Sequence, residues 1–320
     1  MSPAIYAIVA IIIGFILLTW SADRFVGGAA ATARNWGISP MLIGLTVVSI
    51  GTSAPEILVS LMSALQGHTD IAVGNAIGSN IANMGLVLGI TALIAPLSVK
   101  PALAKREIPL LLVVTLIAGA CLINSYLGVI ESLVLLSGLF VTLYLMIYWQ
   151  KAHPEEPLVD SEEIEKLPSG KAYLELIGGL VLLLVSAQIL VWGATQIATL
   201  LGVSELVVGL TVVAIGTSLP ELAASVASVL RGHHDIALGN VIGSNIFNLL
   251  AVLSMPGLVA PGRLNESVIS RDYPVMLAFT VLVAAMTMFG KKPKTLGRYT
   301  GIILLVGYGC YGAMLYMQHG

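Results

Sequence analysis

Charged residues are scarce in this sequence: only 10% of the 320 residues are Asp, Glu, Lys or Arg, whereas 57% are hydrophobic, and the mean hydropathy is +0.96. No soluble domain of this length has such a composition, and long apolar runs of about 20 residues are typical of bilayer-spanning helices. The formal net charge of −2, without a basic patch interleaved with aromatic residues, argues against binding to nucleic acid. The composition predicts an all-α polytopic membrane protein in a lipid bilayer.

Cysteines and catalytic motifs are scarce as well. Cys121 and Cys310 lie in apolar segments, so we interpret them as small hydrophobic residues rather than a disulfide or a metal pair. The loops contain no P-loop, no nucleotide-binding glycine pattern and no catalytic domain, so we expect no enzyme and no cofactor. No feature indicates an obligate protein partner. The absence of Lys and Arg before the first apolar run argues against a cleaved signal peptide.

Polar breaks divide the chain into about ten expected transmembrane helices. The only long break, residues 151–171, is interpreted as a linker between two five-helix halves, 1–150 and 172–320, although it could also bind a regulator. The nine breaks fall at residues 34–39, 67–70, 98–106, 124–128, 151–171, 201–205, 231–235, 262–272 and 290–296.

The positions of Lys and Arg predict the orientation of the chain. If the N-terminus faces out, about 13 of these residues lie in inward loops and helix ends, and only Arg263 and Arg271 remain outside. Positive residues are enriched on the cytoplasmic side of membrane proteins. We therefore expect both termini outside and the linker 151–171 in the cytoplasm.

An internal duplication is the most informative feature of the chain. Residues 38–96 align with 203–261 without a gap, at a constant offset of 165, and about 33 of the 59 positions are identical. Because five spans separate equivalent helices, the two copies must have opposite orientations in the membrane. Inverted repeats are typical of secondary transporters with a site near the bilayer midplane, although channels can also be built from them.

Two hexapeptides of the repeat, GTSAPE at 51–56 and GTSLPE at 216–221, place a proline and a glutamate inside an apolar helix. Pro55 lacks an N–H and its ring clashes with the carbonyl four residues back, so we expect the backbone to open near Gly51 and Thr52. Carbonyls freed inside a membrane need partners, and cations are suitable ones. The polar side chains that the two copies add are Thr52, Ser53 and Glu56, and Thr217, Ser218 and Glu221.

A structural role for these glutamates is also conceivable. Ser53 and Glu56 fit a capping box, in which Glu56 would close the start of a half-helix. However, an ionised carboxylate at the centre of the bilayer costs at least about 2.5–3.5 kcal/mol, and Ser53 alone could supply a cap. The pattern therefore favours a functional role.

The next helix of each copy carries a polar face. In GNAIGSNIAN (74–83), Asn75, Ser79 and Asn83 recur every four residues and share one side of a helix. Asn240, Ser244 and Asn248 repeat this face in GNVIGSNIFN (239–248), and the glycine pairs 74/78 and 239/243 permit close helix packing. The alternative interpretation is hydrogen bonding between helices, especially for Asn75 and Asn240.

Together the motifs offer only oxygen ligands, since they contain no Cys, His or Met. Such ligands suit hard cations, Ca²⁺ and Na⁺ above all, whereas Mg²⁺ gives up its water reluctantly. Two glutamates balance one Ca²⁺ or attract several Na⁺. Competition for the same carboxylates is then enough for exchange, and the empty, doubly negative site is costly to move.

With both motifs, GTSAPE…GNAIGSN and GTSLPE…GNVIGSN, the chain resembles the calcium/cation antiporter superfamily, in particular the sodium/calcium exchanger branch and its prokaryotic members. The resemblance covers nearly the whole chain. It implies ten spans in two inverted five-helix repeats, in a prokaryotic inner or plasma membrane. It also implies exchange of three Na⁺ for one Ca²⁺, with two gating helices, about 3–31 and 172–200, that slide across a core of eight.

The resemblance also implies a set of ligands. Glu56 and Glu221 would hold Ca²⁺ with the carbonyls of Thr52 and Thr217, and Asn83 would occupy the remaining central position. Asn248 stands where some relatives, including the potassium-dependent exchangers, have Asp, so the chain resembles the potassium-independent branch. The implied sodium ligands are Ser53, Ser79, Ser218, Ser244 and the carbonyls of Ser49 and Ala214.

Two alternatives to Na⁺/Ca²⁺ exchange remain from the sequence. Glu56 and Glu221 could titrate, so a proton could be the driving ion of a H⁺/Ca²⁺ or other cation antiporter. A cation channel could share the same oxygen-lined centre, and flux without a counter-ion would distinguish it.

The histidine motifs GHTD (67–70) and GHHD (232–235) suggest a metal site or a pH sensor. The predicted topology argues against one shared site, because His68 would face out while His233 and His234 face in. We expect instead a glycine turn followed by Asp70 or Asp235 as the N-cap of the next helix.

Overall fold

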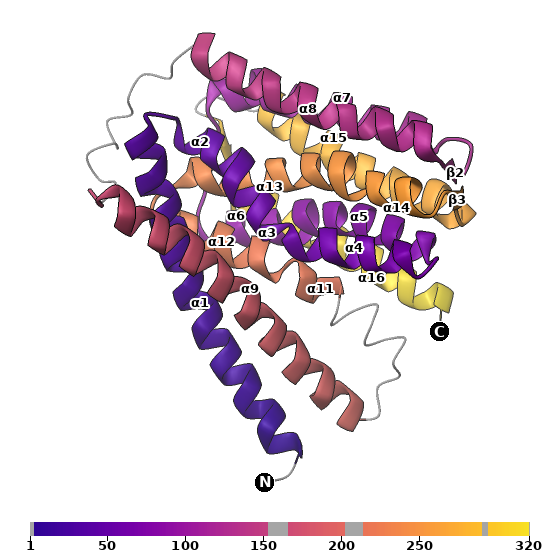
Figure 1. Ribbon diagram of the computed structural model, residues 1–320, viewed down its shortest axis with the longest axis horizontal. Helices are drawn as coiled ribbons and strands as arrows, with labels where there is room; N and C mark the ends of the chain where they lie inside the picture. Colours follow the sequence, from indigo (N-terminus) through magenta and orange to yellow (C-terminus); the bar gives the residue numbers. More distant parts are fainter. Residues whose placement is uncertain (1–2, 153–165, 202–213, 290–293, 320) are drawn as a thin grey trace.

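The computed structural model describes residues 3–152, 166–201, 214–289 and 294–319, and almost all of them are helical (Figure 1). Within these ranges seven helices are long and apolar enough to cross a membrane, or eight if the bent pair Pro40–Thr52 and Ala54–Leu65 forms one span. The prediction of an all-α polytopic membrane protein is confirmed. The described ranges contain fewer candidate spans than the ten predicted. One reason is that residues 202–213, which precede the short apolar helix Leu219–Leu230, lie outside these ranges.

The first half of the chain contains eight α-helices, three π-helical segments (η) and two short strands. In chain order they are α1 (Pro3–Trp36), α2 (Pro40–Ile43), η1 (Gly44–Val48), α3 (Ser49–Thr52), α4 (Ala54–Leu65), α5 (Thr69–Ala82), η2 (Asn83–Val87), α6 (Leu88–Ile94), β1 (Leu97–Ser98), η3 (Leu103–Glu107), α7 (Ile108–Leu122), β2 (Tyr126–Leu127) and α8 (Val129–Ala152).

The second half repeats this order over its described residues. Its elements are α9 (Ser169–Leu200), α11 (Ala214–Thr217), α12 (Leu219–Leu230), α13 (His234–Phe247), η6 (Asn248–Val252), α14 (Ser254–Val259), β3 (Gly262–Arg263), η7 (Val268–Asp272), α15 (Tyr273–Phe289), β4 (Thr295–Leu296) and α16 (Arg298–His319). The π-helical segments η2 and η6, and likewise η3 and η7, are separated by the same offset of 165 as the sequence repeat.

Some predicted breaks are shorter in the structure. Helical structure starts at residue 101 rather than after 106, and at residue 266 rather than after 272, so the charged residues there lie in first helical turns. Long charged side chains at a helix end can reach the interface while the backbone stays helical. The break predicted at 34–39 begins only at Gly37, whose φ of +65° suits the turn that ends α1. Most of the breaks predicted at 151–171, 201–205 and 290–296 lies outside the described residues.

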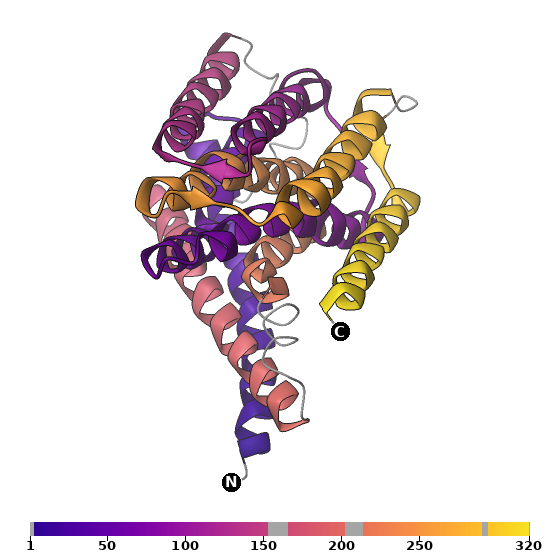
Figure 2. The ribbon, with the colours of Figure 1, turned by 90° about the vertical axis from the view of Figure 1, so that its right-hand side faces the viewer.

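Two long helices, α1 and α9, lie side by side and are inclined to the remaining bundle (Figures 1 and 2). They are in very close contact: a Cβ at Gly28 would lie 2.3 Å from the backbone nitrogen of Leu176, and one at Gly179 would lie 2.6 Å from that of Phe25. Both helices extend beyond the predicted gating segments 3–31 and 172–200, to Trp36 and from Ser169.

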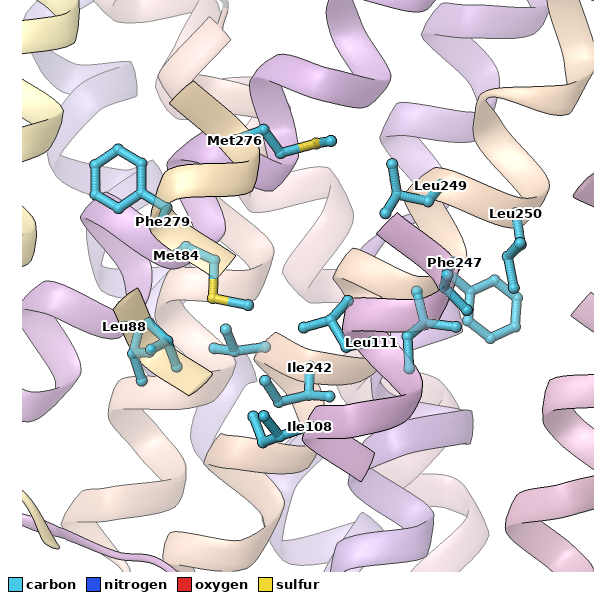
Figure 3. Close-up of a cluster of buried hydrophobic side chains, with 14 of the residues drawn as sticks. Met84, Leu88, Ile108, Leu111, Ile242, Phe247, Leu249, Leu250, Met276 and Phe279 are labelled. Atoms are coloured by element: carbon cyan, nitrogen blue, oxygen red, sulfur yellow. The ribbon is translucent and has the colours of Figure 1, made fainter. Parts of the chain in front are cut away.

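The remaining helices pack around α13, whose apolar span is fully buried. Side chains from η2, α6, α7, α13, η6 and α15 form the apolar core around it (Figure 3). The predicted close approach at the glycine pair of α13 is confirmed, because a Cβ at Gly239 would lie 2.7 Å from the carbonyl oxygen of Met41. Two antiparallel strand pairs, β1 with β4 and β2 with β3, tie the halves together, and Leu97, Leu127 and Leu296 of these strands belong to the core.

The predicted glycine turns are confirmed, but the predicted N-caps are wrong. Gly67 and Gly232 have φ values of +80° and +77°. The cap positions are His68 and His233, without a side-chain capping bond. Both aspartates bind to the other half of the chain instead: Asp70 accepts a hydrogen bond from the backbone N–H of Asn265 at 2.8 Å, and Asp235 forms an ion pair with Lys100.

Candidate ion-binding site

Both proline-containing helices are interrupted at the motif. α3 ends at Thr52 and α4 begins at Ala54, with a bend of 44° between the two parts. α11 ends at Thr217 and α12 begins at Leu219. A proline in the first turn of the second part fits there because that position needs no intrahelical N–H donor. The predicted opening near Gly51 and Thr52 therefore occurs one residue later, at the serine.

The two glutamates lie in the first turns of α4 and α12, and both are fully buried. A helix N-terminus favours a negative charge in this position. Their carboxylates are close enough to interact electrostatically. Both carboxylate oxygens of Glu56 and Oε2 of Glu221 lack any hydrogen-bond partner. Buried anionic oxygens without partners are costly, so this arrangement is suited to binding a cation.

Ser53 connects the two copies rather than capping its own helix. Its hydroxyl donates a hydrogen bond to Oε1 of Glu221 at 3.0 Å, and neither Ser53 nor Ser218 makes a side-chain capping bond. The capping-box interpretation of Ser53 and Glu56 is therefore wrong. The symmetry-related hydroxyl of Ser218 is buried and has no partner.

The asparagines at the start of the polar faces serve as hydrogen-bond links between helices. Asn75 donates to the carbonyl of Glu56 and to Oγ of Ser60, both at 3.1 Å. Asn240 makes the same two contacts in the second copy, with the carbonyl of Glu221 at 3.2 Å and Oγ of Ser225 at 3.0 Å, and it also accepts from Thr52 at 3.1 Å. Each link holds the backbone of a glutamate against the following helix.

We expect Asn240→Ala to destabilise the protein more than Asn75→Ala. Asn240 is fully buried and makes one more hydrogen bond than the half-buried Asn75, so its loss leaves more buried polar groups unpaired. A difference of about 1–2 kcal/mol is expected from such bonds. Thermal unfolding of both purified variants, followed by tryptophan fluorescence, measures it. Equal melting temperatures would contradict this assignment.

The later residues of the two polar faces are buried but mostly unpaired. Asn83 and Asn248 are completely buried, and neither the oxygen nor the nitrogen of either amide has a partner. The hydroxyl of Ser244 is also without a partner, and Ser79 on the first face lies beside Glu56. Buried polar groups are normally hydrogen-bonded, so the unpaired atoms from both copies are candidate ligands for an ion.

The residues whose carbonyls are the implied ligands lie at or just before the two helix breaks. The carbonyl of Ser49 accepts from the backbone N–H of Ser53 at 3.0 Å, and the Ser49 hydroxyl bonds to the carbonyl of Leu45 at 2.7 Å. Thr217 is buried beside the break. Ala214 begins α11, immediately after residues outside the described ranges. The roles of these carbonyls, and those of Thr52 and Thr217, stay predictions.

Sequence reasoning missed Asn80 and Asn245. Asn80 donates to the carbonyl of Asn245 at 3.3 Å, so α5 and α13 are joined directly, and the side-chain oxygens of both residues lack partners. These residues lie off the four-residue spacing that marked the polar faces. Their recurrence at the offset of 165, next to Ser79 and Ser244, was the available signal.

The three histidines of the GHTD and GHHD motifs do not belong to this site. His68 lines an open surface pocket with Asp70 and Arg263, whereas His233 directly precedes α13 and His234 is its first residue. Burial, together with the positive charge of Arg231, lowers the pKa of His233.

A sequence model described as sodium/calcium exchanger protein matches residues 6–148 and 171–317. The chain belongs to this sodium/calcium exchanger family. It is 48% identical to putative antiporter CaxA of Alkalimonas amylolytica, over 97% of this chain and 98% of that protein. It is 32% identical to sodium/calcium exchanger MaX1 of Methanosarcina acetivorans, over 96% and 97% of the two chains.

A solved structure and a further sequence relative agree with this family assignment. A structure of the sodium-calcium exchanger NCX_Mj, soaked with Na⁺ and no Ca²⁺, superposes with a TM-score of 0.85 at 34% identity, over 97% of this chain and 99% of the other. By sequence, inner membrane protein YrbG of Escherichia coli is 42% identical over 96% of this chain and 95% of its own length. This exchanger family member is thus a membrane protein with the fold of a cation/Ca²⁺ antiporter.

Proposed function

We propose that this chain exchanges Na⁺ for Ca²⁺ at a site between Glu56 and Glu221. The observation that carries the proposal is the pair of buried carboxylates, three of whose four oxygens have no hydrogen-bond partner. Hydroxyl and amide oxygens from both copies complete an all-oxygen site for hard cations. The names of MaX1 and NCX_Mj, both sodium/calcium exchangers, support the same ions.

The charge of the site explains the coupling. Two carboxylates are balanced by one Ca²⁺ or by several Na⁺, and either load lowers the cost of exposing the site to the low-dielectric membrane. The empty site retains both negative charges and crosses poorly. Ca²⁺ therefore moves in one direction only when Na⁺ returns in the other.

The architecture proposed for this exchange has ten spans in two inverted five-helix repeats that alternately expose the site. The contacts of Asn75 and Asn240, which recur at the offset of 165, support the repeat. The close pairing of α1 and α9, inclined to the bundle, supports their movement as one unit (Figure 2). The Lys and Arg distribution supports external termini and a cytoplasmic linker 151–171 in a prokaryotic inner membrane.

Protons are the second candidate for the driving ion. The unpaired oxygens of Glu56 and Glu221 can bind protons as well as metal ions. The neutral amides of Asn83 and Asn248 add no further titratable group and give no extra charge for K⁺.

The test is ⁴⁵Ca²⁺ uptake into proteoliposomes loaded with Na⁺, with K⁺-loaded vesicles and an imposed pH gradient as controls. We expect uptake only with internal Na⁺, and we expect it to be electrogenic. Uptake driven by the pH gradient would favour the proton antiporter. Uptake independent of every counter-ion would indicate a channel and contradict exchange.

A further inference from the structure

An ion pair joins the inclined helix α1 to the end of α12. Both carboxylate oxygens of Asp23 on α1 accept hydrogen bonds from Arg231, one of them from Nη2 at 2.8 Å. Arg231 is the residue directly after α12, at the turn formed by Gly232. Such bidentate pairs are the stronger and more directional kind. This one connects the α1–α9 pair to the bundle.

The surroundings of Arg231 are shaped for this contact. A Cβ at Gly27 would lie 2.8 Å from Nη1 of Arg231 and 3.2 Å from its Cζ, so a glycine there leaves room for the guanidinium against α1. The neighbouring cation, Arg24, pairs with Glu175 of α9 at 3.1 Å, within the inclined pair itself. Asp23, by contrast, is a charge of α1 that binds the bundle.

The repeat provides an internal comparison. At the offset of 165, the counterparts of Asp23, Gly27 and Arg231 are Gln188, Trp192 and Gln66. Both glutamines are exposed, and within the described ranges no hydrogen bond joins them. The side of the molecule that carries Gln188 and Gln66 therefore has neither the charges nor the space found at Asp23 and Arg231.

The burial of α12 near Arg231 and the burial of the equivalent part of α4 near Gln66 also differ. On the Arg231 side, α1 covers Ala224 and Ala227 of α12, which are buried in one apolar cluster with Phe25. The corresponding residues of α4 on the other side are Val59, which is half-buried, and Met62, which is 53% exposed. The molecule is closed where the ion pair is formed and more open where it is absent.

We propose that Asp23 and Arg231 form a one-sided latch that favours the conformation closed on the Arg231 side. The inference rests on the proposed alternating access, because opening on that side requires α1 to leave α12 and break the pair. An interaction present in only one conformation shifts the equilibrium toward it. The neutral counterpart at Gln188 and Gln66 offers no equal interaction in the opposite conformation. The Arg231 side is the predicted cytoplasmic side.

The test measures the exposure of α12 through a reporter cysteine. In the full chain with Cys121 and Cys310 replaced by Ala, Ala227→Cys is reacted with a thiol-specific fluorophore, with and without Na⁺ and Ca²⁺. We expect Asp23→Asn and Arg231→Gln to raise the labelling rate about two- to fivefold, the effect of one partly exposed ion pair. Arg24→Gln, which removes the adjacent cation, is the matched control and should leave the rate unchanged.

A second reporter separates the latch from a general loss of structure. Ala118→Cys lies in the buried core of α7 and should remain unreactive in every variant. Faster labelling of both reporters, or an unchanged or slower rate at Ala227→Cys, would overturn the latch. If Na⁺ and Ca²⁺ leave the labelling rate of the parent with Asp23 and Arg231 intact unchanged, that result counts against the proposed function. The ratio of the variant rate to the parent rate still decides the latch.

Discussion

Glu56→Gln and Glu221→Gln should each reduce Na⁺-driven Ca²⁺ uptake by about a hundredfold or more, since removing one charge from a buried charged site typically costs 3–5 kcal/mol. The amide leaves a single negative charge, which no longer balances Ca²⁺. Both carboxylates are completely buried in the first turns of symmetry-related helices. Bulk water therefore cannot replace the lost negative charge at the ion. ⁴⁵Ca²⁺ uptake into Na⁺-loaded proteoliposomes measures the effect.

Stability distinguishes loss of the site from loss of the fold. Without ions, Glu56→Gln should unfold at the same temperature as the parent or higher, because it removes a buried carboxylate whose oxygens have no partner. Adding Ca²⁺ should raise the melting temperature of the parent but not of the variant, since a ligand stabilises only the protein that binds it. Glu266→Gln, at an exposed helix start, is the matched control. Normal uptake by Glu56→Gln would contradict the assignment.

Gly243→Leu should prevent stable assembly of the bundle, at a cost of about 3 kcal/mol or more from overpacking. A Cβ at Gly243 would lie 2.5 Å from the carbonyl oxygen of Leu45 and 2.6 Å from Oγ of Ser49. The backbone of η1 cannot move away without disturbing α3, which leads directly to the helix break at Ser53. We therefore expect uptake to be lost together with thermal stability.

The matched control for this substitution is Gly309→Leu. Gly309 also lies within a helix, but it is exposed on α16 and has open space at its Cβ position. Yield of monodisperse protein and the melting temperature in detergent are the measurements. A Gly243→Leu protein as stable as Gly309→Leu would show that α13 and η1 can separate at little cost.

Features that depend on local sequence were predictable. Pro55 and Pro220 break their helices because a proline lacks an N–H and clashes with the preceding turn, whatever the surroundings. The four-residue spacing of Asn75, Ser79 and Asn83 defines one face of a helix before any packing is known. The glycines at 67 and 232 form the predicted turns, with positive φ, for an equally local reason.

Features that depend on a partner from the other half were not predictable. Asp70 and Asp235 have the sequence position of N-caps, yet the folded chain brings them to Asn265 and Lys100. Ser53 looks like a cap for its own helix, but its hydroxyl reaches Glu221. Local hydrogen bonds compete with tertiary ones, and the sequence does not state which is available.

By itself, then, the sequence determined the all-helical membrane architecture, the breaks at the two proline motifs, the internal duplication and the placement of two carboxylates within the apolar segments. Only the tertiary structure decided that Asn75 and Asn240 are bonded while Asn83 and Asn248 are unpaired. It also decided that Asp23 meets Arg231 on one side alone. The physical reason is that periodicity and backbone chemistry act within a few residues, whereas the pairing of polar groups depends on which side chains the packed helices bring together.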